Sequence, residues 1–138
     1  MLGFGEIFTR LILAVALGSL FGLERELRHK EAGMRTNILV ALGSALVMIT
    51  SLSFEGSPAT IASGVIAGIG FLGGGLIIRS EGRVHGITTA ATVWVVAALG
   101  LACGAGYFEA AMAAGIIGLV VLYFLGWTKV REAAKLND

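Results

Sequence analysis

Residues 59–78 read ATIASGVIAGIGFLGGGLII, a run of apolar and small residues with no charged side chain. A helix rises about 1.5 Å per residue and the apolar core of a bilayer is about 30 Å thick, so about 20 such residues cross a membrane. The run also lacks the period-two alternation of lipid-facing barrel strands. It therefore predicts a full-length transmembrane helix.

The rest of the chain is built in the same way. Four further apolar runs are long enough, or nearly long enough, to cross a bilayer. The predicted spans are Ile7–Leu23, Thr36–Leu52, Ala59–Ile78, Ile87–Cys103 and Phe108–Trp127. Charged residues make up only 14% of the chain and mean hydropathy is +0.90, whereas soluble domains carry about 25% charged residues. We expect one all-α integral membrane domain, with about five glycine-rich transmembrane helices, over residues 1–138.

The basic residues predict an orientation. Nine of the ten Lys and Arg residues fall after the first, third or fifth predicted span, and the other two connections contain none. The positive-inside rule makes the basic segments cytoplasmic, with the N-terminus outside the plasma membrane. Arg10 is the exception, because it lies inside the first span. Glu6, four residues earlier, is spaced to form an ion pair with it on a helix.

The glycines predict close helix packing. A G-x-G-x-x-G pattern at residues 68–73 lies in the middle of a span rather than between a strand and a helix, so it predicts no nucleotide site. Small residues four positions apart let helices approach closely in lipid. In the third span the packing residues are Gly64, Gly68, Gly70, Gly73, Gly74 and Gly75. Similar ridges are Ala14, Gly18 and Gly22, then Gly100 and Gly104, then Ala111 and Gly115. We expect contacts with lipids and between copies in a homo-oligomer.

The connection after the first span mixes charges of both signs. It is either a solvated loop that sets topology or a polar cluster drawn into the bundle as a ligand or partner site. The candidate cluster is Glu24, Arg25, Arg35, Thr36 and Asn37. Exposed N–H groups at the start of the second span are suited to hold an anion. Three hydroxyl residues open the fourth span and are expected to bond to carbonyls or across helices. They are Thr88, Thr89 and Thr92.

The sequence predicts neither an enzyme nor a metal or cofactor site. It contains no Asp before residue 138, no phosphate-binding P-loop and no HExxH motif. His29 and His85 lie far apart, without metal-ligand spacing, and the single Cys103 provides no thiolate cluster. A net charge of +1 gives no overall field for nucleic acid.

Three blocks of the sequence resemble the signatures of the MgtC/SapB family of membrane proteins. The first block combines Gly22-Leu23-Glu24-Arg25 with Ala32-Gly33-Met34-Arg35-Thr36. The second is Gly68–Gly75 and the third is Gly86–Trp94, in the same order and separation as in the family. The resemblance implies an inner-membrane protein associated with magnesium-limited growth and, in pathogens, with virulence through survival inside macrophages. It also implies a regulator of other membrane machinery, including the F-type ATP synthase.

The predicted function is therefore regulation of, or interaction with, other membrane machinery in adaptation to low magnesium. The alternative is a transporter or channel for magnesium or another small ion or solute. A transporter is expected to place ionisable groups near the middle of the membrane. The middles of the predicted spans contain none, which favours the regulator.

Overall fold

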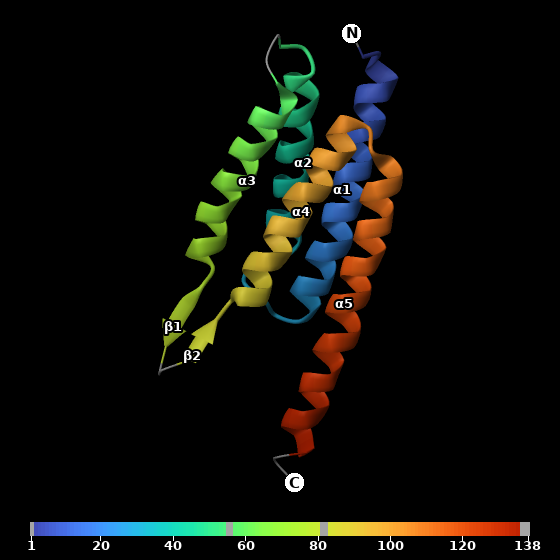
Figure 1. Cartoon of the computed structure of the whole chain (residues 1–138). Helices are drawn as coiled ribbons and strands as arrows, with labels where there is room; N and C mark the ends of the chain where they lie inside the picture. The colour runs from blue at the N-terminus through green and yellow to red at the C-terminus, as the bar shows by residue number, and fades with distance from the viewer. Residues whose placement is uncertain (1, 55–56, 81–82, 136–138) are drawn as a thin grey trace.

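Long apolar helices dominate the structure (Figure 1). The computed structural model describes residues 2–54, 57–80 and 83–135. Its helices are α1 Phe4–Leu27, α2 Met34–Ser51, α3 Pro58–Gly75, α4 Ile87–Ala105 and α5 Phe108–Lys135. All five are long and apolar enough to cross a membrane, which confirms the predicted all-α membrane fold.

Several helix boundaries differ from the sequence prediction, and the ends of α1 and α3 are two of them. Helix α1 continues past Leu23 to Leu27, so the charged segment after the first predicted span is partly helical. Helix α3 stops at Gly75, whereas the predicted third span continued to Ile78. Each successive glycine costs a helix about 1 kcal/mol relative to alanine, which explains why the helix ends at a run of three. Ile78 instead opens strand β1 (Ile78–Ser80), which pairs antiparallel with β2 (Arg83–His85).

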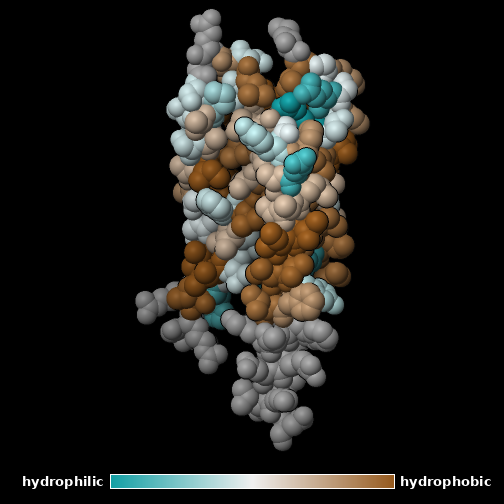
Figure 2. Space-filling model, turned by 45° about the vertical axis from the view of Figure 1, so that its right-hand side comes forward, coloured by the Kyte–Doolittle hydropathy of each residue, from teal (hydrophilic) through white to brown (hydrophobic). Residues whose placement is uncertain are grey.

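Helices α1, α2 and α4 form the centre of the bundle. Helix α3 packs on α4 and α2, and α5 packs on α4 and α1. In its most apolar window α4 is 61% buried, whereas α3 and α5 are each 11% buried. The main core cluster consists of Ala14, Leu17, Phe21, Ala41, Ala45, Val96, Leu99, Cys103 and Ala111. Figure 2 shows apolar side chains gathered in the lower half of the described part of this face, with hydrophilic and weakly polar residues mixed among them toward the other end.

Glycines allow the three central helices to touch through their backbones. A Cβ atom added at Gly22 of α1 would lie 2.5 Å from the Cα of Met34 in α2. One added at Gly104 of α4 would lie 2.5 Å from the carbonyl oxygen of Ala45, also in α2. Such contacts are possible only without a side chain. The predicted packing ridges on the first and fourth spans are therefore confirmed.

The two ends of the bundle carry different connections. The N-terminus lies at the end where α2 gives way to α3 and α4 to α5 (Figure 1). The opposite end carries the α1–α2 connection, the β1–β2 hairpin and the last residues of α5. We call this the basic end, because it also carries Arg25, Arg28, Lys30 and Arg35. That the basic end is cytoplasmic stays a prediction.

Candidate functional site

The candidate site lies at the basic end, around the residue 28–33 connection between α1 and α2. Arg25, on the last turn of α1, is only 3% exposed and forms an ion pair with the neighbouring Glu24. The other carboxylate oxygen of Glu24 lies 2.6 Å from Nε of Arg28. A buried charge near a membrane is costly unless it is paired. Here two arginines share one carboxylate, so this cluster keeps a net positive charge.

Glu26 occupies the N-terminus of α2. Its Oε2 accepts a hydrogen bond of 2.9 Å from the backbone N–H of Met34, the first residue of that helix. Helix N-termini attract anions because their N–H groups have no partner within the helix. The sequence predicted anion binding at this place, and the chain supplies the anion itself.

Glu31 approaches a second helix N-terminus. Its Oε2 lies 3.4 Å from the hydroxyl oxygen of Thr89, in the first turn of α4. The connection therefore places one carboxylate near the start of each of two helices. The helix dipole stabilises such carboxylates, and the effect falls off within the first turn.

The buried side chain of Asn37 holds the last residues of the connection, next to the start of α2. The side chain is fully buried, and its Nδ2 donates hydrogen bonds of 2.8 Å to the carbonyl oxygens of Ala32 and Gly33. Its Oδ1 is also buried and accepts no hydrogen bond from the residues that the structure describes. Ala32 itself is 1% exposed and packs with Val93 and Ile69. The connection is thus folded against the bundle rather than extended into solvent.

The predicted cluster is only partly brought together. Glu24 and Arg25 form the ion pair at the end of α1. Asn37 is buried in the first turn of α2. Arg35 and Thr36 are exposed, so they lie on the surface of this end and not in its interior. Whether these residues bind a ligand or partner stays a prediction.

The three threonines at the start of α4 differ in their exposure to the surroundings. Thr88 is exposed, whereas Thr89 and Thr92 are buried. The Thr92 hydroxyl donates a 2.8 Å hydrogen bond to the Thr88 carbonyl, one turn earlier. Satisfaction of a backbone carbonyl is what the sequence led us to expect for this residue.

Most glycines of α3 have open space where a Cβ atom would lie. A Cβ atom added at Gly73 would meet the Cβ of Ala90 in α4 at 3.6 Å. A Cβ atom would meet no described atom within 4 Å at the remaining glycines predicted for packing, which are Gly64, Gly68, Gly70, Gly74 and Gly75. Within one chain these five glycines do not contact another helix. Contact with a second copy stays a prediction.

Sequence reasoning missed a long-range contact of Arg10, at the opposite end of the bundle. The expected ion pair with Glu6 forms, at 2.5 Å. The guanidinium also donates a 2.6 Å hydrogen bond to the carbonyl oxygen of Gly104, in the last turn of α4. A cation is favourable at a helix C-terminus. The i,i+4 spacing revealed the ion pair, but no sequence signal pointed to a carbonyl 94 positions away.

The three carboxylates of residues 24–31 are all engaged by other groups of the chain. Glu24, Glu26 and Glu31 are each engaged by arginines or by groups in the first turn of a helix. Among the described residues no group of three or more His, Cys, Asp or Glu side chains is placed to hold a metal ion. The exposed cations Lys30 and Arg35 remain on the surface.

Comparison with known proteins identifies the family. The profile described as the MgtC family matches residues 11–131. The Protein MgtC of Salmonella typhimurium strain LT2 is 45% identical over 126 residues, which is 91% of this chain and 52% of that protein. The Protein MgtC of Brucella abortus strain 2308 is 44% identical over 110 residues, 78% of this chain and 46% of that protein. An uncharacterized protein of Synechocystis is 44% identical over 117 residues, covering 83% and 50% of the two chains.

The chain thus spans about half the length of the curated relatives it matches. No solved structure matches it. The family profile covers most of the residues that form the five helices, and the two proteins named MgtC share nearly half of the aligned positions. The chain is a multi-pass membrane protein that belongs to the MgtC family.

Proposed function

We propose that this chain is a bacterial inner-membrane protein that regulates other membrane machinery during adaptation to low magnesium. The surface that contacts the partner is the basic end, centred on Lys30, Arg35 and Thr36. In this proposal the protein is not an enzyme, binds no nucleic acid and works as a homo-oligomer. The F-type ATP synthase is the partner that the family resemblance implies.

One observation carries the proposal: hydrogen bonds tie the connection at the basic end to α2 while its outer cations stay exposed. Asn37 anchors two of its carbonyls, and Glu26 ties it to the start of α2. Lys30 and Arg35 are left on the surface. A pre-organised charged surface loses little conformational entropy on binding, which suits recognition of a protein partner.

The packing of the central helices supports a regulator over a transporter. Gly18 and Gly100 let α1 and α4 approach α2 so closely that an added Cβ at Gly18 would lie 2.8 Å from the carbonyl oxygen of Asn37. Backbone contact of this kind fills the space that a polar pathway would need. The buried arginines Arg10 and Arg25 lie near opposite ends of α1 and are each paired with a glutamate. Paired charges at the membrane faces are not the mid-membrane ionisable groups typical of transport.

Co-purification from native membranes tests the proposal. The tagged full chain, expressed in bacteria grown at low magnesium, is expected to retain subunits of the F-type ATP synthase. Arg35→Glu reverses an exposed charge at the basic end and should lower this recovery severalfold, without changing thermal stability. The matched control is Glu109→Lys, which reverses an exposed charge at the start of α5, at the opposite end. Equal recovery with both variants, or no recovery above an untagged control, would contradict the proposal.

A further inference from the structure

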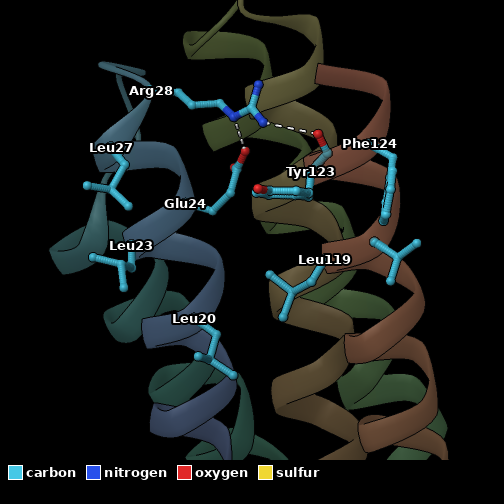
Figure 3. A pocket seen from close by; sticks show the side chains of 9 residues that line it. Leu20, Leu23, Glu24, Leu27, Arg28, Leu119, Tyr123 and Phe124 are labelled. Atoms are coloured by element: carbon cyan, nitrogen blue, oxygen red, sulfur yellow. Dashed lines mark hydrogen bonds and ion pairs between the residues drawn. The ribbon is translucent and has the colours of Figure 1, made fainter. Parts of the chain in front are cut away.

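A groove lies between α1 and α5 toward the basic end (Figure 3). Its volume is about 480 Å³. Most of its lining is apolar, and one end is polar because Glu24 and Arg28 stand there. The apolar side chains that line it are Leu20, Leu23, Leu27, Leu119, Val120 and Phe124. Both helices belong to the membrane-spanning part of the chain, so the groove opens toward lipid.

Helices α1 and α5 touch beside the groove. A Cβ atom added at Gly115 of α5 would lie 3.0 Å from Cδ2 of Leu17, and one added at Gly118 would lie 2.8 Å from the Phe21 ring. These contacts close the space between the two helices on the side away from the basic end. A helix with side chains is about 10–12 Å across, so a volume of about 480 Å³ holds roughly one helical turn. An extended acyl chain is much narrower than a helix and can lie inside the groove.

The polar end of the groove holds a fixed cation. Nε of Arg28 lies 2.6 Å from Glu24, and Nη2 donates a 3.2 Å hydrogen bond to the carbonyl oxygen of Tyr123 in α5 (Figure 3). Arg25 pairs with the same Glu24 carboxylate. Two guanidinium groups thus face one carboxylate, and the Arg28 side chain is still 25% exposed. Glu24 and Arg28 line the groove, and the buried Arg25 behind them gives this three-residue cluster one excess positive charge.

We propose that this groove binds an anionic phospholipid. One acyl chain lies along Leu20, Leu23 and Leu119, and the headgroup phosphate meets the guanidinium of Arg28. Apolar burial would bind the acyl chain of any phospholipid, whereas the excess positive charge selects an anionic headgroup. A lipid bound here would contact both α1 and α5. Helix α1 leads directly into the candidate site, and α5 is the last helix of the described residues.

Native mass spectrometry of the full chain in detergent tests this proposal. Phosphatidylglycerol and phosphatidylcholine with identical acyl chains are added in separate titrations, so that the two probes differ only in the headgroup. The first phosphatidylglycerol molecule is expected to bind roughly tenfold more tightly than the first phosphatidylcholine molecule. This ratio is the size expected for one charge-assisted contact with a partly exposed arginine. Arg28→Gln should abolish this preference. Arg35→Gln, an exposed arginine of the same end that does not line the groove, should retain it.

A second variant tests the acyl part of the site independently. Leu23→Trp fills the apolar groove and should weaken binding of both lipids severalfold, with thermal unfolding showing that the variant is folded. Equal affinity of the wild type for both lipids, or a preference retained by Arg28→Gln, would overturn the proposal. A change in oligomer mass with unchanged lipid binding in Leu23→Trp would assign the groove to a second copy instead. Complete displacement of phosphatidylglycerol by inorganic phosphate would overturn the acyl-chain site and leave only an anion contact.

Discussion

Replacing Gly104 with alanine should destabilise the bundle, whereas the same change at Gly43 should not. Gly104 of α4 packs directly on the backbone of α2. Gly43 lies on an exposed face of α2, and a Cβ atom there would meet nothing within 4 Å. The two variants add the same methyl group to a helix, in the middle of α2 at Gly43 and in the last turn of α4 at Gly104, so they form a pair that differs mainly in packing.

The expected difference follows from the contacts. A methyl group at Gly104 would lie 2.5 Å from the carbonyl oxygen of Ala45 and 2.8 Å from Cβ of Met48. Ordinary carbon contacts are about 3.5–4.0 Å, so α4 and α2 must separate by roughly 1 Å. Overpacking of this size costs about 1–3 kcal/mol. Gly43→Ala gains about 1 kcal/mol of helix propensity, and Gly104→Ala, in the last turn of its helix, gains no more than that. Their free energies of unfolding should therefore differ by about 1–3 kcal/mol.

Reversible unfolding in mixed micelles, with the fraction of denaturing detergent as the variable, measures this difference. Gly43→Ala should unfold at the same fraction as the wild type or a higher one, and Gly104→Ala at a lower one. Both variants should first be shown to have the same oligomer mass as the wild type, so that assembly does not enter the comparison. Equal stability of the two variants would refute backbone contact between α2 and α4.

Further predictions concern the buried arginines and the orientation in the membrane. Arg10→Met should destabilise the bundle by about 1–3 kcal/mol in the same unfolding assay, because the last turn of α4 loses a buried charged donor. Arg25→Ala should destabilise it more than Lys30→Ala, because Arg25 is 3% exposed and paired whereas Lys30 is exposed; equal effects would mean that the Arg25 pair is merely a surface contact. Cysteines placed at Ser57 and His29, in a background without the native cysteine, should react with impermeant reagents from opposite sides of the membrane, with Ser57 outside; labelling of both from one side would contradict the predicted orientation.

Much of the fold follows from the sequence because lipid restricts the choice of structure. A membrane-spanning segment must satisfy its own backbone groups, so long apolar runs can only be helices here. The boundary of α3 was harder to predict, because residues 76–78 are apolar and continue the run in composition. Gly86 adopts φ 85°, and a Cβ there would collide with the carbonyl oxygen of Leu76. Hydropathy alone does not reveal this tertiary contact between Gly86 and Leu76, so it could not predict where α3 ends.

Sequence spacing located some of the packing glycines but not their partners. The ridges on the first and fourth spans were predicted, and both turn toward α2. Spacing alone also drew attention to Gly68 and Gly70, and each of them has open space where a Cβ atom would lie. Small residues four apart occur on any helix face, and only tertiary structure decides which face meets a neighbour. The same limit explains why the contact of Arg10 with Gly104 was missed.

The contacts of the α1–α2 connection were only partly predictable from the sequence. Mixed charges marked the α1–α2 connection, and Glu24 with Arg28 was correctly spaced for a pair. The roles of Glu26 and Glu31 depend on where the starts of α2 and α4 lie in space. Helix N-termini far apart in sequence become neighbours only after the bundle forms. Sequence could therefore suggest that an anion would bind there, but not that the chain provides it.

Magnesium entry into liposomes tests the central claim most directly. Purified protein is reconstituted into vesicles that contain a magnesium-sensitive dye, and entry is followed after magnesium is added outside. A regulator whose central helices pack backbone to backbone is expected to give no saturable entry above that of protein-free vesicles. Saturable, protein-dependent entry that is lost in Glu24→Gln or Thr88→Ala would contradict the account and establish a transporter.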